Sequence, residues 1–447
     1  MLKTFKYRLY PDTVQQQLLS KTFGCCRFVY NRCLDFKNKR YAAHKQSVSR
    51  YELSAMLTFL KKTEEFSFLN EVNSQSLQSE LVHLDKAYTN FFQHHAAFPK
   101  FKSKYDRQSF ACPQRVAVDF KSQSLSIPKF PGIKTIFHRQ FTGKIKTCTI
   151  SKNAANKYYV SILVDDGMEL PKSKAVKDQT AIGLDVGLKS FVVTSAGDVV
   201  DNPKFYRNAE SRIKVLQRRV SRKVKGSANC RKAKLRLAKK HDKVASQRSN
   251  FLHQVSSRLV KNHDTIFVED LNVKGMIKNR CLAKSISDAS WSEFFRQLKY
   301  KSEWYGKNLL EIGRFEPSSK MCSCGVVNHK LTLTDRCWTC GSCGIIHDRD
   351  LLAAQNIKKF GLLGLTYRTR TERSGEPVEL SALAEAVKQE SLASDGRSLC
   401  LKANVVHEVT RESLIAEMKQ AMDAGEPLIG RIAKVHLPKQ QDSEIVR

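Results

Sequence analysis

The pattern of apolar and polar positions predicts a strand, a helical block and several more strands in the first part of the chain. Apolar residues alternate with polar ones over residues 1–12, which is typical of a strand. From about 13 to 97 the apolar residues recur every three or four positions, with Lys and Arg between them, and this spacing predicts helices. Residues 105–168 form short alternating segments separated by turn residues. We therefore expect a first domain, 1–175, made of a small β-barrel or sandwich with an inserted helical domain.

The second part of the chain alternates strand and helix patterns, which predicts an α/β domain over 176–362. Residues 181–200 have the pattern of a β-hairpin that turns at Gly187. Residues 203–262 form a long helical region rich in Lys and Arg, and 265–272 contains an apolar run that ends in two acids. Such a run is typical of a central strand, which would carry the acids at its carboxyl end.

A stripe of large apolar residues follows at helical spacing between 291 and 309. Its members are Trp291, Phe294, Phe295, Leu298, Tyr305 and Leu309. We expect one helix whose apolar face packs in the core rather than binding a cofactor. The tail 363–447 has mixed charge and unclear periodicity, and the sequence assigns it no role.

The segment FPKFKSK at 98–104 interleaves aromatic residues with lysines. Aromatic rings can stack on bases while ammonium groups contact phosphates, so the segment is a candidate for nucleic-acid contact. An ordinary edge strand protected by lysines would have the same composition. The local sequence favours neither interpretation.

The charge of the chain indicates the class of its partner. Of 447 residues 41% are hydrophobic, and 77 Lys and Arg stand against 43 Asp and Glu, a net charge of +34. A folded protein with this excess repels itself unless a polyanion neutralises it, and nucleic acid is the obvious polyanion. A basic ribosomal protein or a membrane-surface protein is the alternative. No stretch approaches the ~20 apolar residues of a membrane helix.

The 13 cysteines are expected to be reduced. The N-terminal sequence MLKTFKYRLYPD lacks the apolar core of a signal peptide, so we expect a cytoplasmic protein without a membrane partner. In that compartment cysteines serve as metal ligands more often than as disulfides.

Three acids have positions suited to binding hard divalent ions. Asp185 lies inside an apolar strand, Glu269 ends the strand in IFVED, and Asp350 begins a helical segment. A buried acid needs a neutralising partner such as a metal, and two divalent ions ~3.5–4 Å apart hydrolyse phosphodiesters in many nucleases. A few carboxylates suit Mg²⁺, because water and phosphate fill its other positions. Ordinary alternatives exist: Glu269 or Asp270 could simply end a strand. Asp348 or Asp350 could equally cap a helix.

Four cysteines between the last two acids have the spacing of a zinc ribbon at about 319–345. They are Cys322 and Cys324 in MCSCG, and Cys340 and Cys343 in WTCGSCG. Four thiolates at such spacing form a tetrahedral structural zinc site, which leaves no open position for catalysis. The first pair is one residue shorter than C-x-x-C, and Cys337 is a nearby substitute. A redox pair or coincidental cysteines are the alternatives.

Together these motifs resemble the TnpB (OrfB) family of bacterial insertion-sequence proteins, which are relatives of the type V CRISPR effectors. The resemblance rests on GLDVGLKSF, VEDLNVKGM, SWSEFFRQLKYKSEWYGKNLLEIGRF, PSSK with C-S-CG, and WTCGSCGIIHDRD with AAQNI. It covers roughly residues 1–390 and includes YRLYPDTVQQQLL and FPKFKSK near the N-terminus.

The resemblance implies an RNase H-like (RuvC) nuclease domain with an inserted zinc ribbon, in which Asp185, Glu269 and Asp350 are the catalytic acids. It also implies a Mg²⁺-dependent DNA endonuclease of an insertion sequence, with structural Zn²⁺. The partners would be a guide RNA from the end of its own element and double-stranded target DNA. Sequence choice would come from base pairing, while the protein recognises geometry and one short DNA motif. We expect a monomer; the guide sequence, the DNA motif and the cut pattern are not legible in the chain.

Several positions depart from the family pattern. The first cysteine pair lacks one residue, Met321 replaces the usual Thr, Glu316 replaces an aromatic residue, and Leu352 replaces an Asn. The alternative function is therefore a catalytically impaired RNA-guided DNA-binding protein, either a regulator or a decaying copy. A transposase that joins DNA itself is a third hypothesis, but the sequence has no His-apolar-His triplet for its metal site.

Overall fold

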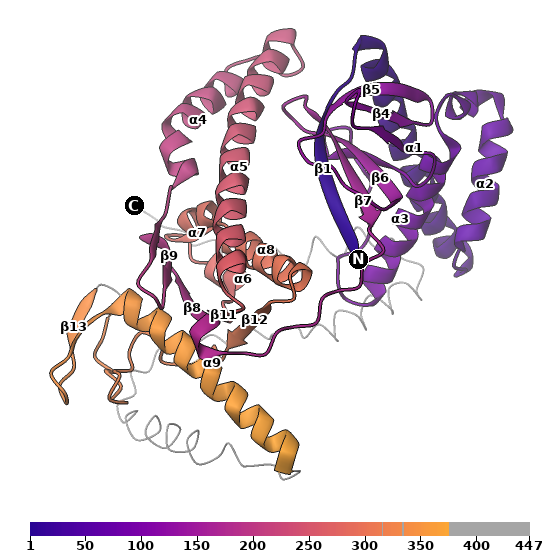
Figure 1. Ribbon diagram of the computed structural model, residues 1–447. Helices are drawn as coiled ribbons and strands as arrows, with labels where there is room; N and C mark the ends of the chain where they lie inside the picture. Colours follow the sequence, from indigo (N-terminus) through magenta and orange to yellow (C-terminus); the bar gives the residue numbers. More distant parts are fainter. Residues whose placement is uncertain (315, 333–334, 375–447) are drawn as a thin grey trace, which may run out of the picture. The chain divides into compact units, whose positions relative to one another are not determined.

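The computed structural model describes residues 1–314, 316–332 and 335–374, with side chains placed as far as residue 364 (Figure 1). Helix α9 (Arg349–Ser374) covers the first residues of the predicted tail, and the remainder of 363–447 lies outside the described residues. Across these ranges, no helix combines the length and the apolar content needed to cross a membrane.

The chain forms two compact units. One consists of Leu2–Asn153 and Lys157–Asp166, and the other begins at Gly167. Residues 167–177 connect them without helix or strand, and the boundary expected at 175 lies in this connection. The last strand of the first unit ends at Asp165, one residue before the end of that unit's segment.

The first unit is built on a seven-stranded antiparallel sheet. In sheet order the strands are β2 (Gln108–Cys112), β6 (Lys144–Lys152), β7 (Tyr158–Asp165), β1 (Leu2–Tyr10), β5 (Phe130–Ile136), β4 (Ser124–Ile127) and β3 (Ala117–Asp119). Phe110 of β2 and Phe130 of β5 stack with ring centroids 6.5 Å apart, although their strands lie four places apart in the sheet. A flat sheet would separate them by about 19 Å. The sheet therefore curls strongly on itself, in the direction of the small barrel expected.

Helices fill the interval between β1 and β2, where the helical insertion was predicted. They are α1 (Thr13–His44), α2 (Arg50–Lys62), the 3₁₀ segment η1 (Glu64–Glu71) and α3 (Ser74–Phe92). Asp12 is the N-cap of α1: its carboxylate accepts the backbone N–H of Gln15 at 2.8 Å, and the Gln15 side chain accepts the N–H of Asp12. The apolar faces of these helices join the core of the sheet.

The lysine-aromatic segment 98–104 is not a strand, which removes the protected-edge interpretation. Lys102 anchors it to the helices: its Nζ lies 2.6 Å from the buried Glu80 carboxylate and 3.8 Å from the Tyr30 ring centroid. Phe101 is 57% exposed beside this anchor. A stacking role for the segment is therefore compatible with its structure.

The second unit is built on a five-stranded mixed sheet flanked by helices. Its strands, in order, are β10 (Val199–Asp201), β9 (Ser190–Thr194), β8 (Ala181–Val186), β11 (Thr265–Glu269) and β12 (Asn308–Ile312). Its helical elements are η2 (Asp178–Thr180), α4 (Phe205–Ser221), α5 (Ala228–Asn262), α6 (Val273–Met276), α7 (Ala283–Ala289), α8 (Trp291–Trp304) and α9. β11 runs parallel to both β8 and β12, whereas β9 is antiparallel to β8 and β10. The predicted hairpin and central strand are thus confirmed.

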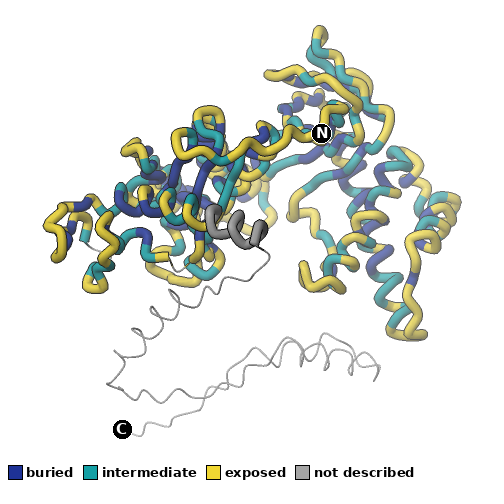
Figure 2. Tube along the Cα trace, turned by 60° about the horizontal axis from the view of Figure 1, so that its bottom comes forward, coloured by how far each residue is buried: buried dark blue, intermediate teal, exposed yellow. Residues whose placement is uncertain are grey.

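The two faces of this sheet pack against different helices. Ile182, Leu184, Ile266 and Val268 share a core with Leu252, Val255 and Leu259 of α5 and with Phe294 and Leu298 of α8. On the other face, Ala181 and Phe267 pack with Ile357 of α9. The central strands are almost wholly buried between these layers (Figure 2). Residues at alternate positions along β8 and β11 therefore face α9.

The single helix predicted from Trp291 to Leu309 is wrong in its second half. α8 ends at Trp304, Tyr305 is 55% exposed, and Leu309 belongs to β12. Gly306 has a φ of +60°, a left-handed conformation that glycine adopts readily and that ends the helix. The stripe is continuous in sequence because the helix and the following strand both contribute apolar residues to the core.

Candidate functional site

The strand register makes Asp185 and Glu269 neighbours. β8 and β11 run parallel with Val268 beside Leu184, so the next residue of each strand is one of the two acids. Adjacent strands lie about 4.8 Å apart. Because side chains alternate along a strand, Asp185 lies on the same face as Gly183, which is the face covered by α9.

Helix α9 brings the third acid to this face. A Cβ on Gly183 would lie 2.1 Å from the backbone oxygen of Ala354, so the absence of a side chain lets the helix approach the strand. Asp350 lies one helical turn before Ala354, in the first turn of α9. The structure thus brings together the three predicted acids, Asp185, Glu269 and Asp350.

The acids affect one another electrostatically. Burial, followed by the charges of Glu269 and Asp350, raises the pKa of Asp185 to about 7, against the opposing charge of Arg349. Three repelling carboxylates at one place, one of them buried, form a donor set that suits a hard divalent cation such as Mg²⁺. Among the described residues, the oxygens of the three acids do not all lie within 4.8 Å of one another, whereas the sulfurs of the four cysteines do.

The neighbouring acids have structural roles instead. Asp348 is the N-cap of α9, since its Oδ1 accepts the backbone N–H of Asp350 at 3.0 Å and of Leu351 at 2.9 Å. Asp270 pairs with Arg314. Of the alternatives that the sequence left open, Asp348 is therefore the helix cap, and Asp270 follows the end of β11 with its carboxylate paired to Arg314.

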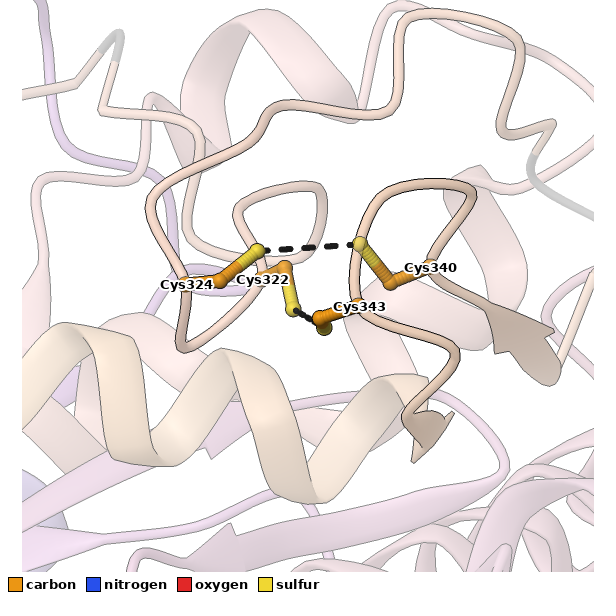
Figure 3. A group of neighbouring side chains, drawn as sticks. All are labelled: Cys322, Cys324, Cys340 and Cys343. Atoms are coloured by element: carbon orange, nitrogen blue, oxygen red, sulfur yellow. Dashed lines mark hydrogen bonds between the residues drawn. The ribbon is translucent and has the colours of Figure 1, made fainter.

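The four cysteines of the predicted ribbon converge within 4.8 Å (Figure 3). The Sγ atoms of Cys322 and Cys343 lie 3.4 Å apart, and those of Cys324 and Cys340 lie 3.7 Å apart. Tetrahedral zinc with bonds of about 2.3 Å separates its sulfurs by about 3.8 Å. The thiol group therefore fits a structural zinc ion.

Two glycine turns build the thiol site despite the short first pair. The N–H of Gly325 donates to the carbonyl of Cys322, and that of Gly344 to the carbonyl of Cys340, both at 2.9 Å. Both glycines have positive φ, +95° and +72°. The turn from Cys322 to Gly325 is one residue shorter than the turn from Cys340 to Gly344, and the sulfurs of Cys322 and Cys324 still reach the thiol group. Cys337, the possible substitute, is exposed in β13 (Cys337–Thr339) outside the group.

A histidine that the sequence analysis did not single out supports the thiol site. His347 lies in β14 (Ile346–Asp348), which pairs with β13, and its Nε2 is 3.0 Å from Sγ of Cys322. Burial raises the pKa of this thiol, but hydrogen bonds with the Cys324 backbone and His347 outweigh it and lower the pKa to about 5. A thiolate is the form that binds metal. The motif HDRD contains this histidine, but its spacing matches no ligand pattern.

The departure at Leu352 is accommodated by the ribbon. Its side chain is 3% exposed and packs with Cys322, Trp338 and Cys340. Leu352 thereby joins the start of α9 to the thiol site, and an apolar residue suits this buried position.

Comparison with known proteins supports the resemblance found in the sequence. A family model described as "Probable transposase" matches residues 161–280, a "Helix-turn-helix domain" model matches 1–46, and a "Cas12f1-like, TNB domain" model matches 291–357. Over 364 residues the chain is 41% identical to a "Putative RNA-guided DNA endonuclease" of Streptomyces pristinaespiralis, covering 80% of this chain and 89% of the relative. It is 31% identical over 375 residues to the "Putative RNA-guided DNA endonuclease InsQ" of Escherichia coli K12, covering 80% and 92%.

Solved structures show a weaker likeness. The "Cas12f1-sgRNA-target DNA complex" aligns with a TM-score of 0.48 and 12% identity, over 80% of this chain and 98% of that one. The level of identity to the curated relatives, over most of both chains, is decisive. This chain belongs to the OrfB (TnpB) family.

Proposed function

We propose that this protein is an RNA-guided, divalent-metal-dependent DNA endonuclease associated with an insertion sequence. The observation that carries the proposal is the meeting of Asp185, Glu269 and Asp350 on one face of the β8–β11 pair beneath α9. The names of the relatives, putative RNA-guided DNA endonucleases, support it. We assign the mixed sheet with its antiparallel β9 and β10 to the RuvC/RNase H type of nuclease domain.

In this proposal each acid has a defined part. Asp185, Glu269 and Asp350 would hold Mg²⁺, which when bound activates a water and stabilises the leaving oxygen in phosphodiester hydrolysis. The backbones of Asp185 and Glu269 are held by pairing with β9 and β12, and the backbone of Asp350 lies in the capped first turn of α9. Zinc held by the four cysteines would be structural, because four protein ligands leave no open position.

The partners follow from charge and family. The net charge of +34 suits guide RNA and double-stranded DNA, whose phosphates bind cationic surfaces without regard to sequence. Helices α4 and α5 supply many of these cations in the second unit. We propose that a guide RNA from the element end selects the target by base pairing, and that the protein acts in the cytoplasm as a monomer.

The test is cleavage of a plasmid library by the protein co-expressed with its flanking element-end RNA, in Mg²⁺. Matched variants are Glu269→Gln and Asp270→Asn, which remove one charge each from adjacent residues. Cutting should require the RNA, disappear in Asp185→Ala and Glu269→Gln, and persist in Asp270→Asn. Absence of cutting by a folded, RNA-bound protein would contradict the nuclease proposal and favour the guided DNA-binding alternative.

A further inference from the structure

A buried serine links the carboxylate site to the base of the zinc ribbon. Ser318 is 7% exposed, and its hydroxyl donates to Oε1 of Glu269. It stands four residues before Cys322, the first thiol of the ribbon. A carboxylate accepts several hydrogen bonds, so this one leaves lone pairs on Glu269 for a cation.

The backbone around Ser318 is held from two sides. Asn356 of α9 is 3% exposed, and its amide nitrogen donates to the carbonyls of Ser318 and Met321, both at 2.7 Å. The N–H of Met321 donates to the carbonyl of Pro317 at 3.0 Å, which closes a turn immediately before Cys322. The backbone of Ser318 is therefore tied by hydrogen bonds to α9 and to the turn that precedes the first cysteine of the ribbon.

We propose that Ser318 is a positioning residue that orients the Glu269 carboxylate for divalent-metal binding and couples it to the zinc ribbon. This inference rests on the proposed function. Its physical basis is that a ligand held by an outer hydrogen bond gives up less rotational freedom when it binds a cation. Glu269 ends its strand, where pairing fixes the backbone but not the side chain, so the hydroxyl supplies the missing restraint.

The test measures Mn²⁺ binding to the zinc-loaded full-length protein by electron paramagnetic resonance, without RNA. Mn²⁺ prefers the same oxygen ligands as Mg²⁺ and is visible to this method. The matched pair is Ser318→Thr and Ser318→Val, which have nearly the same shape and differ in the hydroxyl. Ser319→Ala is the neighbouring control, and Asp185→Ala identifies the ions held by the acids.

Loss of the hydroxyl should weaken Mn²⁺ binding at the acids by 10- to 100-fold, roughly the usual effect of removing an outer partner of a ligand. Ser318→Val should show this loss with zinc content unchanged, Ser318→Thr should restore most of the affinity, and Ser319→Ala should match the unmodified protein. Asn356→Ala should act through the same route, so its effect and that of Ser318→Val should combine to less than their sum.

Two outcomes would overturn the inference and are distinguishable from each other. Equal Mn²⁺ affinity in the Thr and Val variants, with binding abolished by Asp185→Ala, would leave the metal site intact and remove the role of Ser318. Mn²⁺ binding that Asp185→Ala does not change would overturn the metal site itself, and with it the proposed function.

Discussion

The segment from Ser318 to Cys322 contacts the carboxylate cluster at Glu269 and enters the thiol cluster at Cys322. The two clusters are nevertheless built by different means. The four thiols belong to two turns, each closed by a local hydrogen bond to a glycine N–H, and β13 and β14 pair next to them. The three acids come from two strands and a helix that are distant in the sequence. A site closed by local turns tolerates changes elsewhere, whereas a site assembled by packing depends on each contact that brings its elements together.

The largest expected effect comes from breaking the thiol cluster, because Ser318 and Asp350 flank it. Cys340→Ser should abolish binding of one zinc and reduce RNA-guided cleavage by more than about 100-fold through misplacement of Asp350. Cys337→Ser is the matched control and should keep both zinc and cleavage, since Cys337 lies outside the group. Elemental analysis and plasmid cutting measure the two effects, and a zinc-free Cys340→Ser variant that still cuts would break the link between the clusters.

The next prediction disturbs the carboxylate cluster and leaves the thiol cluster in place. In Gly183→Ala the new Cβ would meet the backbone of Ala354 at 2.1 Å and of Lys358 at 2.7 Å, and neither backbone atom can yield as a flexible side chain would. We expect α9 to shift, at a cost of about 3 kcal/mol, the upper part of the usual range for overpacking. Urea unfolding should record this loss, and cleavage should fall with it.

Zinc content provides the contrast for Gly183→Ala. The ribbon closes through its own turns, so the variant should retain its zinc while it loses cleavage. If the zinc content of the variant fell to the same extent as its cleavage, the two clusters would be one cooperative structure.

A smaller effect is expected at two glycines within α9. A Cβ on Gly361 would lie 2.1 Å from the ring of buried Phe267, whereas nothing lies within 4 Å of one on Gly364. Gly361→Ala should destabilise the protein by about 1–3 kcal/mol because the ring must move. Gly364→Ala should stabilise the helix by up to about 1 kcal/mol. Thermal unfolding of the two variants measures the difference, and equal midpoints would contradict the close packing of α9 on β11.

Local patterns explain how much of this site the sequence could predict. An acid inside the apolar strand IGLDV and another ending IFVED are visible without a structure, because strand burial has a sequence signature. The paired cysteines are visible because the ligands of a turn-built site are close in the sequence. The alternation of strands and helices in the second part of the chain and the helices between the first two strands were predicted for the same reason, and the structure has these elements in that order.

The remainder depends on contacts between distant segments. The hydroxyl of Ser318 on Glu269, His347 beside Cys322 and the close approach at Gly183 involve residues with no local pattern of their own. The end of α8 was missed because the apolar spacing continues into β12. The sequence also could not tell which of Asp348 and Asp350 caps α9, because both stand near the start of the helix and either could be its N-cap.

That last pair gives the prediction with the smallest expected change in stability. Asp348 accepts two backbone N–H groups of α9, so Asp348→Ala should cost about 1 kcal/mol, the usual value for a lost N-cap. Asp348→Asn should retain most of that stability because its amide oxygen can still accept. Cleavage should fall only modestly in both variants, whereas Asp350→Asn should abolish it with little change in the urea midpoint. The opposite result would be loss of cleavage in the Asp348 variants and normal cleavage in Asp350→Asn. It would exchange the roles of the two acids and assign Asp348, rather than Asp350, to the metal site.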